Sequence, residues 1–150
     1  MANQLKDVGT AVVAVVEPDT SALVVAQLMR KHHIGAMVVV DAEQKSRALG
    51  IVSDRDLVLG LVAEGLDPAI FTAGDLMSDK LVTALPEMDA MDAVQLMNLH
   101  QVRRLVIIDD ADRLVGIVTM EDLLELFASE LALLAAGIVG AREREITLRH

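Results

Sequence analysis

The heptapeptide GIVSDRD occupies residues 50–56, and a close counterpart, GIVTMED, occupies residues 116–122. Each begins with glycine, carries a hydroxyl residue at its fourth position and ends in aspartate. Pro18 and Pro86 stand 68 positions apart but the heptapeptides only 66, because a polar loop in the first half is two residues longer. Surface loops accept such insertions while the flanking segments keep their register. The chain therefore consists of two copies of one unit.

Hydrophobic periodicity predicts the same order of elements in both copies. Apolar residues with i, i+3, i+4, i+7 spacing run from Ala22 to Met29 and from Ala90 to Met97, which predicts helices with one buried face. A short β-rich run precedes each helix, and an unbroken apolar run, typical of a strand buried on both sides, follows it. These runs are residues 12–16 and 81–84, then 37–40 and 105–108. A polar turn, a second strand through the heptapeptide and a helix starting at its Ser or Thr complete each copy.

The predicted fold class is therefore α/β (α+β), with two β-α-β-β-α repeats. One copy is too small to bury its sheet well, so we expect the repeats to pack through their sheets with pseudo-two-fold symmetry. The predicted boundaries are residues 8–62 for the first repeat, 63–74 for a Gly- and Pro-containing linker, 75–126 for the second repeat and 127–150 for a C-terminal helical extension.

Composition argues against several classes of protein. A net charge of −10 and the absence of Trp and Tyr argue against a nucleic-acid partner, which requires a basic footprint and stacking platforms. The absence of cysteine excludes disulfides and favours a reducing compartment. The first residues lack the basic region of a secretory signal, and Glu125 and Glu130 interrupt the most apolar stretch, which argues against a membrane span. We expect a cytoplasmic protein with no membrane partner.

The heptapeptides admit two interpretations. Ser53 and Thr119 are good N-cap residues, and Asp56 and Asp122 follow three positions later, as in a variant of the capping box. Alternatively, a helix N-terminus after a strand offers free N–H groups to an anion, and a short carboxylate there accepts hydrogen bonds from ribose hydroxyls. The spacing alone favours neither interpretation.

The succession of Pro, ALVVAQLM, GAMVVVD and GIVSDRD, repeated as Pro, AMDAVQLM, RRLVIID and GIVTMED, resembles the cystathionine β-synthase (CBS) domain in its tandem arrangement, the Bateman module. HHIGAMVVVD and GIVSDRDLV are most similar to small bacterial stand-alone CBS pairs. The resemblance implies a regulatory module, not an enzyme. It also implies a ligand in the cleft between the repeats: AMP, ADP, ATP, S-adenosylmethionine or NADH, with no obligatory cofactor.

Carried onto this chain, the resemblance places the ribose contacts at Asp56 and Asp122, with Ser53 and Thr119 beside them. It places main-chain contacts to adenine in two groups of residues. These are Thr10, Ala11, Ile34, Gly35 and Ala36, and Ser78 to Val82 with Val102 and Arg103.

The two expected nucleotide sites are unequal, because a basic residue before the second strand of a repeat often binds phosphate in this family. Arg103 and Arg104 occupy that place in the second copy, where the first has Gly35 and Ala36. We therefore expect one better site and a weaker one around Ser53 and Asp56, to which Arg55 adds charge. The better site comprises Thr10, Ile34, Gly35, Ala36, Arg104, Thr119 and Asp122.

Other polar groups predict no further chemistry. His32 and His33 lack a third metal ligand, and Asp109, Asp110 and Asp112 lack the glycine and glutamate of a calcium loop. No nucleophile is paired with a base. We therefore expect no metal site and no catalytic site.

The C-terminal residues predict one long helix from Met120 to about Arg144. Leu124, Phe127, Leu131, Leu134 and Ile138 follow 3 and 4 spacing, as in an a/d seam. This stripe packs either on its own repeat or on a partner, and we expect a homodimer with the helix at or beside the interface.

Two functions remain open from sequence. The first is a sensor that binds an adenosine nucleotide and alters a regulated protein partner. The second is a CBS-pair scaffold for oligomerisation or interaction that binds no nucleotide.

Overall fold

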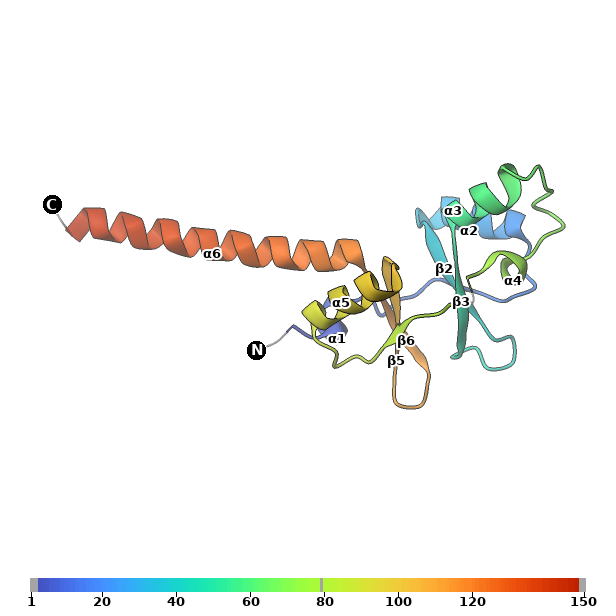
Figure 1. The fold of residues 1–150 in the computed structure, drawn as a ribbon, viewed down its shortest axis with the longest axis horizontal. Helices are drawn as coiled ribbons and strands as arrows, with labels where there is room; N and C mark the ends of the chain where they lie inside the picture. The colour runs from blue at the N-terminus through green and yellow to red at the C-terminus, as the bar shows by residue number, and fades with distance from the viewer. Residues whose placement is uncertain (1–2, 79, 149–150) are drawn as a thin grey trace.

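The computed structural model describes residues 3–78 and 80–148, so residue 79 of the predicted adenine contacts and residues 149–150 of the predicted extension lie outside it. The predicted β-α-β-β-α order is confirmed in both copies (Figure 1). The first copy contains β1 (Val15–Val16), α2 (Ala22–His32), β2 (Ala36–Val40), β3 (Ala48–Ser53), α3 (Asp54–Leu57) and the π-helical turn η1 (Val58–Val62). The second contains β4 (Thr83–Ala84), α5 (Ala90–His100), β5 (Arg104–Ile108), β6 (Leu114–Thr119) and α6 (Met120–Leu148). Two short helices, α1 (Leu5–Val8) and α4 (Ala73–Leu76), precede the repeats.

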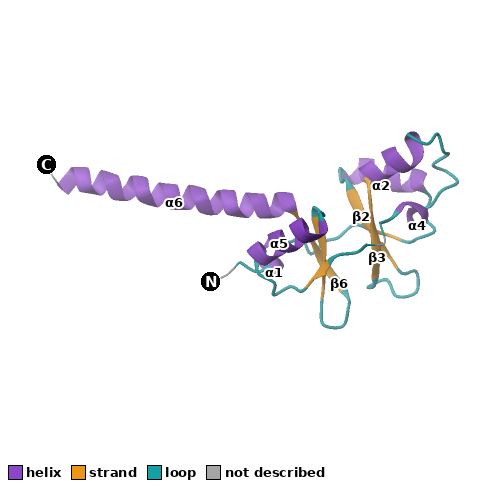
Figure 2. Ribbon diagram, viewed as in Figure 1, coloured by secondary structure: helices purple, strands orange, loops and turns teal. Residues whose placement is uncertain are grey.

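Each repeat forms a three-stranded sheet in which the first two strands are parallel and the last two antiparallel. The sheets lie between the helices of the two repeats (Figure 2). Side chains alternate across a strand, so Met37 and Val39 pack against the helices of their own repeat. Val38 and Val40 instead join Val106 of the second repeat in a shared cluster between the sheets. Burial on both faces explains the unbroken apolar runs in the sequence.

The helices α2 and α5 bury the predicted apolar face. Ala22, Val25 and Met29 are buried on α2, and Ala90, Ala93 and Met97 are buried on α5. The period in the sequence is therefore the period of burial.

The segment that precedes each repeat packs on the other repeat. Leu5 of α1 is fully buried in the core of the second repeat, beside Ala93 and Leu123. Ala73 of α4, at the end of the predicted linker, is fully buried in the core of the first repeat. The two repeats are thus joined by exchanged helices as well as by their sheets.

The chain returns from each exchanged helix across the first glycine of a heptapeptide. Thr10 forms two backbone hydrogen bonds with Ile117, of 2.9 and 3.0 Å, and Ser78 forms the equivalent pair with Ile51. A Cβ atom on Gly116 would lie 3.0 Å from the Thr10 carbonyl oxygen, and one on Gly50 would lie 2.5 Å from that of Ser78. Both heptapeptides therefore require glycine so that the crossing backbone can approach.

Helix α6 leaves the body of the molecule after its first two turns. Leu123 is buried in the core of the second repeat, and Phe127 packs against that core. Every described residue from Ala128 onward is exposed, and the helix projects away from the sheets (Figure 1). Packing of the apolar stripe on its own repeat therefore ends at Phe127.

By length and composition alone, α6 is apolar enough to cross a membrane, with a mean hydropathy of 1.8 over an 18-residue window. Glu125 and Glu130 do not lower the hydropathy of α6 enough to exclude a membrane span by themselves. A single helix that passes such a test is weak support for membrane insertion.

Replacing either crossing glycine with alanine should destabilise the fold. We expect Gly50→Ala to cost about 2 kcal/mol of unfolding free energy and Gly116→Ala somewhat less, because the methyl group meets backbone oxygen. Gly140→Ala, on α6 with no atom within 4 Å of the added Cβ, is the matched control. It should leave stability unchanged or raise it by up to about 1 kcal/mol. Urea denaturation followed by circular dichroism measures all three; equal effects at the three sites would contradict the argument.

Candidate functional site

Each heptapeptide forms a reciprocal capping box at the start of a helix. The Ser53 N–H donates to Asp56 Oδ2 at 2.8 Å, and the Asp56 N–H donates to Ser53 Oγ at 3.2 Å. Thr119 and Asp122 repeat this arrangement at 2.9 and 3.1 Å. The capping interpretation is confirmed. It leaves Oδ1 of each aspartate without a hydrogen-bond partner among the described residues, so each carboxylate keeps an acceptor for another group.

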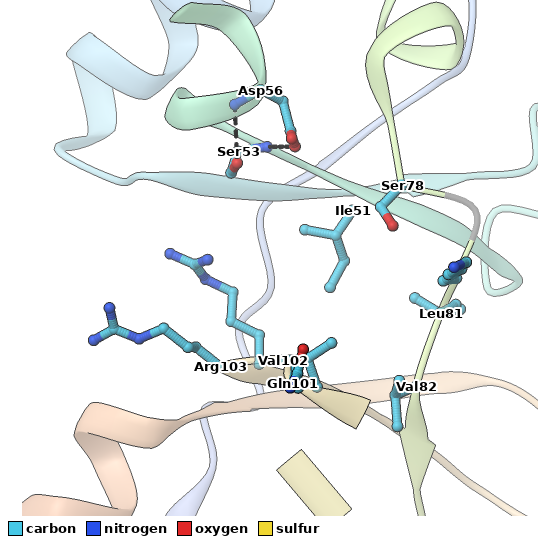
Figure 3. A pocket seen from close by; sticks show the side chains of 11 residues that line it. Ile51, Ser53, Asp56, Ser78, Leu81, Val82, Gln101, Val102 and Arg103 are labelled. Atoms are coloured by element: carbon cyan, nitrogen blue, oxygen red, sulfur yellow. Dashed lines mark hydrogen bonds between the residues drawn. The ribbon is translucent and has the colours of Figure 1, made fainter. Parts of the chain in front are cut away.

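A cleft of about 310 Å³ lies between the repeats beside the first capping box. Ser53 and Asp56 form one wall, while Val82, Gln101 and Val102 lie across the opening (Figure 3). The complete lining is Ile51, Ser53, Asp56, Ser78, Lys80, Leu81, Val82, Gln101, Val102, Arg103 and Arg104. Both repeats are needed to form it, because the exchanged segment brings Ser78 onto Ile51.

The lining separates into three chemical parts. Ile51, Leu81, Val82 and Val102 offer an apolar slot. The capping box offers a carboxylate oxygen that accepts hydrogen bonds from hydroxyl groups. Lys80, Arg103 and Arg104 bring three of the 13 basic residues of an acidic chain to this one cleft. Such a cleft can hold a flat apolar ring, bind hydroxyls and neutralise an anion.

One of the three cations is engaged by a neighbouring carboxylate. Arg103 forms an ion pair with Glu121, and both side chains are largely exposed. A hydrogen bond from its own backbone N–H lowers the pKa of the Glu121 carboxyl, and the nearby charges of Arg103 and Arg104 lower it further. Lys80 and Arg104 have no carboxylate within ion-pair distance in the described part of the chain. These two cations are therefore available to an anionic ligand.

The structure groups the predicted site residues differently from the expected better site. Ser53, Asp56, Ser78, Val82, Val102, Arg103 and Arg104 lie together in the cleft. Arg104 is the cross-strand partner of Thr119, yet it lines the cleft that contains Asp56. The start of β5 faces the first repeat across the sheet interface, so the arginines lie beside the capping box of the other copy.

The remaining predicted residues lie elsewhere. Thr10 and Ala11 line a separate hollow beside Gly116. Arg55 is exposed on α3 and is absent from the cleft lining. Ile34, Gly35, Ala36, Thr119 and Asp122 belong to the position related to the cleft by the internal repeat.

Ile51 and Gln101 line the cleft without having been predicted as ligand contacts, and Lys80 was predicted only within the main-chain range from Ser78 to Val82. An alignment of the two copies carries a signal for Lys80, since its counterpart 68 positions earlier is Val12. Gly35 and Ala36 correspond in the same way to Arg103 and Arg104. The repeat-related position therefore has no counterpart to these three cations, and the two potential sites differ chiefly in charge.

The sequence model of the CBS domain matches residues 5–63 and 73–129. This chain belongs to the CBS domain family. It is a tandem CBS pair, with 40% identity over 121 residues to the CBS domain-containing protein YhcV of Bacillus subtilis, covering 81% of this chain and 83% of that protein. An uncharacterised protein of Methanopyrus kandleri is 41% identical over 108 residues, which span 72% of this chain and 54% of that longer protein.

Solved structures of CBS pairs share the fold. The crystal structure of Hypoxic Response Protein I, which contains two coordinated zinc ions, has a TM-score of 0.71 and 35% identity over 82% of this chain and 98% of that one. Protein PAE2072 of Pyrobaculum aerophilum, solved with AMP, has a TM-score of 0.74 and 23% identity, covering 84% and 99%. The CBS pair of protein MJ0100, solved with 5′-methylthioadenosine and S-adenosyl-L-methionine, has a TM-score of 0.77 and 23% identity, covering 87% and 99%.

Within residues 3–78 and 80–148, no group of three or more His, Asp or Glu side chains is placed to hold a metal ion.

The capping boxes should contribute measurably to stability in the absence of any ligand. We expect Ser53→Ala and Thr119→Ala each to lower the free energy of unfolding by about 1 kcal/mol, because each removes the hydroxyl that accepts from the aspartate N–H. Ser78→Ala changes an exposed hydroxyl of the same cleft and should stay within about 0.5 kcal/mol of the wild type. Chemical denaturation compares them; an equal loss in Ser78→Ala would remove capping as the cause.

Proposed function

We propose that this protein is a regulatory module that binds an adenosine nucleotide in the cleft between its repeats and transmits the resulting conformational change to a protein partner. The observation that carries the proposal is the composition of the cleft. An apolar slot, a carboxylate with one free oxygen and two unpaired cations are placed side by side. Adenine, ribose and phosphate require these three environments in that combination.

We propose a place for each part of the ligand. The base lies between Ile51 and the apolar residues of the second repeat, the ribose hydroxyls donate to Asp56, and the phosphates approach Lys80 and Arg104. The binding of AMP by PAE2072 and of adenosine derivatives by MJ0100 supports an adenosine ligand in this fold. The pose extends that likeness to the side chains of this chain.

The charge of the cleft favours phosphate-bearing ligands. S-adenosylmethionine carries a positive sulfonium, which Lys80 and the arginines repel, whereas AMP, ADP, ATP and NADH carry phosphates that they attract. We therefore propose a nucleotide, not a sulfonium compound, as the signal. Binding of an anion at the contact between the repeats would favour whichever conformation brings the cations closest to it.

No enzymatic step is part of this proposal. Within the described residues, no nucleophile lies in hydrogen-bond contact with a general base in the cleft, and the ligand contacts proposed here only bind and neutralise. We place the protein in the cytoplasm, where adenine nucleotides are abundant, and propose that it acts as a homodimer.

A scaffold that binds no nucleotide is the competing proposal. The position related to the cleft by the repeat carries Val12, Gly35 and Ala36 in place of three cations, so one of the two potential sites lacks anion-binding groups. If the cleft at Asp56 also bound no nucleotide, the CBS pair would act only in oligomerisation or in binding a protein partner.

Thermal shift and calorimetric titration with AMP, ADP, ATP, NADH, S-adenosylmethionine and adenosine distinguish these functions. At a hundredfold excess over Kd, a bound ligand stabilises the folded state by about 2.7 kcal/mol, a rise in Tm of roughly 5–10 °C for a chain of this size. We expect that rise with at least one phosphate-bearing ligand, and little with adenosine. Asp56→Asn keeps an oxygen for the cap but replaces the free acceptor with a donor, so its affinity should fall at least tenfold.

Asp122→Asn is the matched control, because it makes the same change in the second capping box. Its affinity should remain within about threefold of the wild type. No shift with any ligand would favour the scaffold. Equal losses in both variants would instead refute the assignment of the ligand to the Asp56 cleft.

Removing the Glu121 carboxylate, which forms an ion pair with Arg103, should strengthen nucleotide binding. In Glu121→Gln the guanidinium loses its ion-pair partner and becomes free to meet phosphate, so we expect roughly twofold to fivefold tighter binding at low salt. Glu125→Gln, one turn further along α6 and outside the cleft, is the control for net charge. Calorimetry at 50 and 300 mM NaCl tests this, and the gain should shrink at the higher salt. A gain of the same size in Glu125→Gln would contradict a local effect.

A further inference from the structure

The segment of α6 from residue 131 to residue 141, LALLAAGIVGA, contains no polar side chain. All eleven residues are exposed. The exposed fractions of its larger side chains range from 54% at Val139 to 76% at Leu133. Leu133 and Val139 lie on other sides of the helix than Leu134 and Ile138, so the exposed apolar surface is not confined to one face. A helix that is apolar all round is normally covered by other protein or by lipid. This segment therefore needs a partner.

The charges that flank the apolar segment are arranged unequally. Between Met120 and Ala141 every charged residue is acidic: Glu121, Asp122, Glu125 and Glu130. Positive charge on α6 begins only after the segment, at Arg142 and Arg144. The helix thus carries only acidic charges before its apolar segment, whereas after it Arg142 and Arg144 alternate with Glu143 and Glu145.

We propose that α6 pairs with α6 of a second copy in antiparallel orientation, with Ala136 at the centre. When two such segments are laid antiparallel end to end, Leu131 of one helix lies opposite Ala141 of the other, and Leu134 lies opposite Ile138. The same alignment brings Glu130 of each helix level with Arg142 of the other, within one turn of Arg144. Glu130 then meets two arginines at each end of the apolar contact, while Glu143 and Glu145 lie level with the uncharged Ser129 and Phe127.

Parallel pairing lacks this complementarity. It would place Glu130 level with Glu130 of the other helix and leave residues 142–145 level with their own copies, so no arginine would come near Glu130. The charge pattern therefore selects the antiparallel arrangement over the parallel one.

The body of the molecule leaves room for the second helix. Leu123 and Leu126 face the core of their own repeat, and Asn3 contacts Glu130 on that side. Leu124 lies on another side and is 68% exposed, although it belongs to the first turns of α6. It continues a stripe with Leu131 and Ile138 at seven-residue spacing. A second helix on this stripe would reach Leu124 with its own C-terminal turn.

A lipid bilayer is the other environment that could cover the segment, and the hydropathy of α6 allows it. Two observations favour a second copy. Glu130 falls near the middle of the apolar stretch from Leu123 to Val139. An ionised carboxylate at the centre of a membrane-spanning helix costs about 2.5–3.5 kcal/mol of insertion free energy. The net charge of −10 also opposes approach to an anionic membrane surface. In an antiparallel pair Glu130 stays at the end of the apolar contact, beside arginines of the other helix, so the cost of burying it in lipid does not arise.

Engineered cysteines test the orientation directly, because the natural chain contains none. Leu131→Cys and Ala141→Cys are prepared as separate full-length variants and oxidised alone or as an equimolar mixture. In the antiparallel pair, two copies of residue 131 are about 15 Å apart along the axis, beyond disulfide reach. Residues 131 and 141 of different copies are adjacent. We expect disulfide-linked two-chain species in the mixture and little in either variant alone.

The opposite pattern overturns the proposal. Strong cross-linking of each variant with itself would establish parallel pairing. The absence of any cross-link, or a monomeric mass by light scattering at 100 μM protein, would show that no second copy covers α6. Flotation of wild-type protein with phosphatidylcholine vesicles, together with absent cross-links, would assign the segment to lipid.

Charge reversal supplies an independent readout. Glu130→Arg should weaken self-association roughly tenfold by sedimentation equilibrium, and Arg144→Glu should weaken it similarly, because each places like charges in contact. The double variant Glu130→Arg/Arg144→Glu restores opposite charges and should recover most of the affinity. The double variant still lacks the contact between Glu130 and Asn3. Recovery of affinity would therefore show that the loss in Glu130→Arg came from helix pairing and not from that contact. Failure of the double variant to recover would refute the antiparallel register.

Discussion

The fold depends on the close crossing of backbone over glycine at two related points. Thr10 pairs with Ile117 and Ser78 pairs with Ile51, and a side chain on Gly116 or Gly50 would block these contacts. The crossings fix α1 on the second repeat and α4 on the first. They also hold the two sheets face to face, so that Val38 and Val106 share one cluster. Neither repeat completes its core without a segment from the other, which makes the pair a single unit.

The same exchange makes the cleft. Ile51 and Ser78, which pair at one crossing, both line the cleft. The lining comes from both repeats because the start of β5 faces the capping box at Ser53 and Asp56. Duplication would produce two equivalent clefts if the sequences had stayed alike. Substitutions at three aligned positions, which pair Lys80 with Val12 and the two arginines with Gly35 and Ala36, leave one of them cationic. Two positions with the same backbone structure can therefore differ in their affinity for an anionic ligand.

Helix α6 packs on its own repeat only through its first turns. Its first turns belong to the core through Leu123, but every residue of its apolar segment from residue 131 to residue 141 is exposed. Hydrophobic periodicity in a sequence reports that a face is covered and says nothing of what covers it. The placement of Glu130 before the segment and of Arg142 and Arg144 after it supports the proposed partner, a second copy in antiparallel orientation.

The sequence by itself determined the duplication, the order of elements, the buried faces of α2 and α5 and the capping boxes. These features are encoded by local spacing, and each copy corroborates the other. Only the tertiary structure decided which capping box meets the arginines. That pairing depends on how two repeats face each other across the sheet interface, and no local pattern contains this relation. The role of the glycines was likewise hidden, because the backbone that crosses each one comes from a segment about thirty residues away at Gly50 and over a hundred away at Gly116.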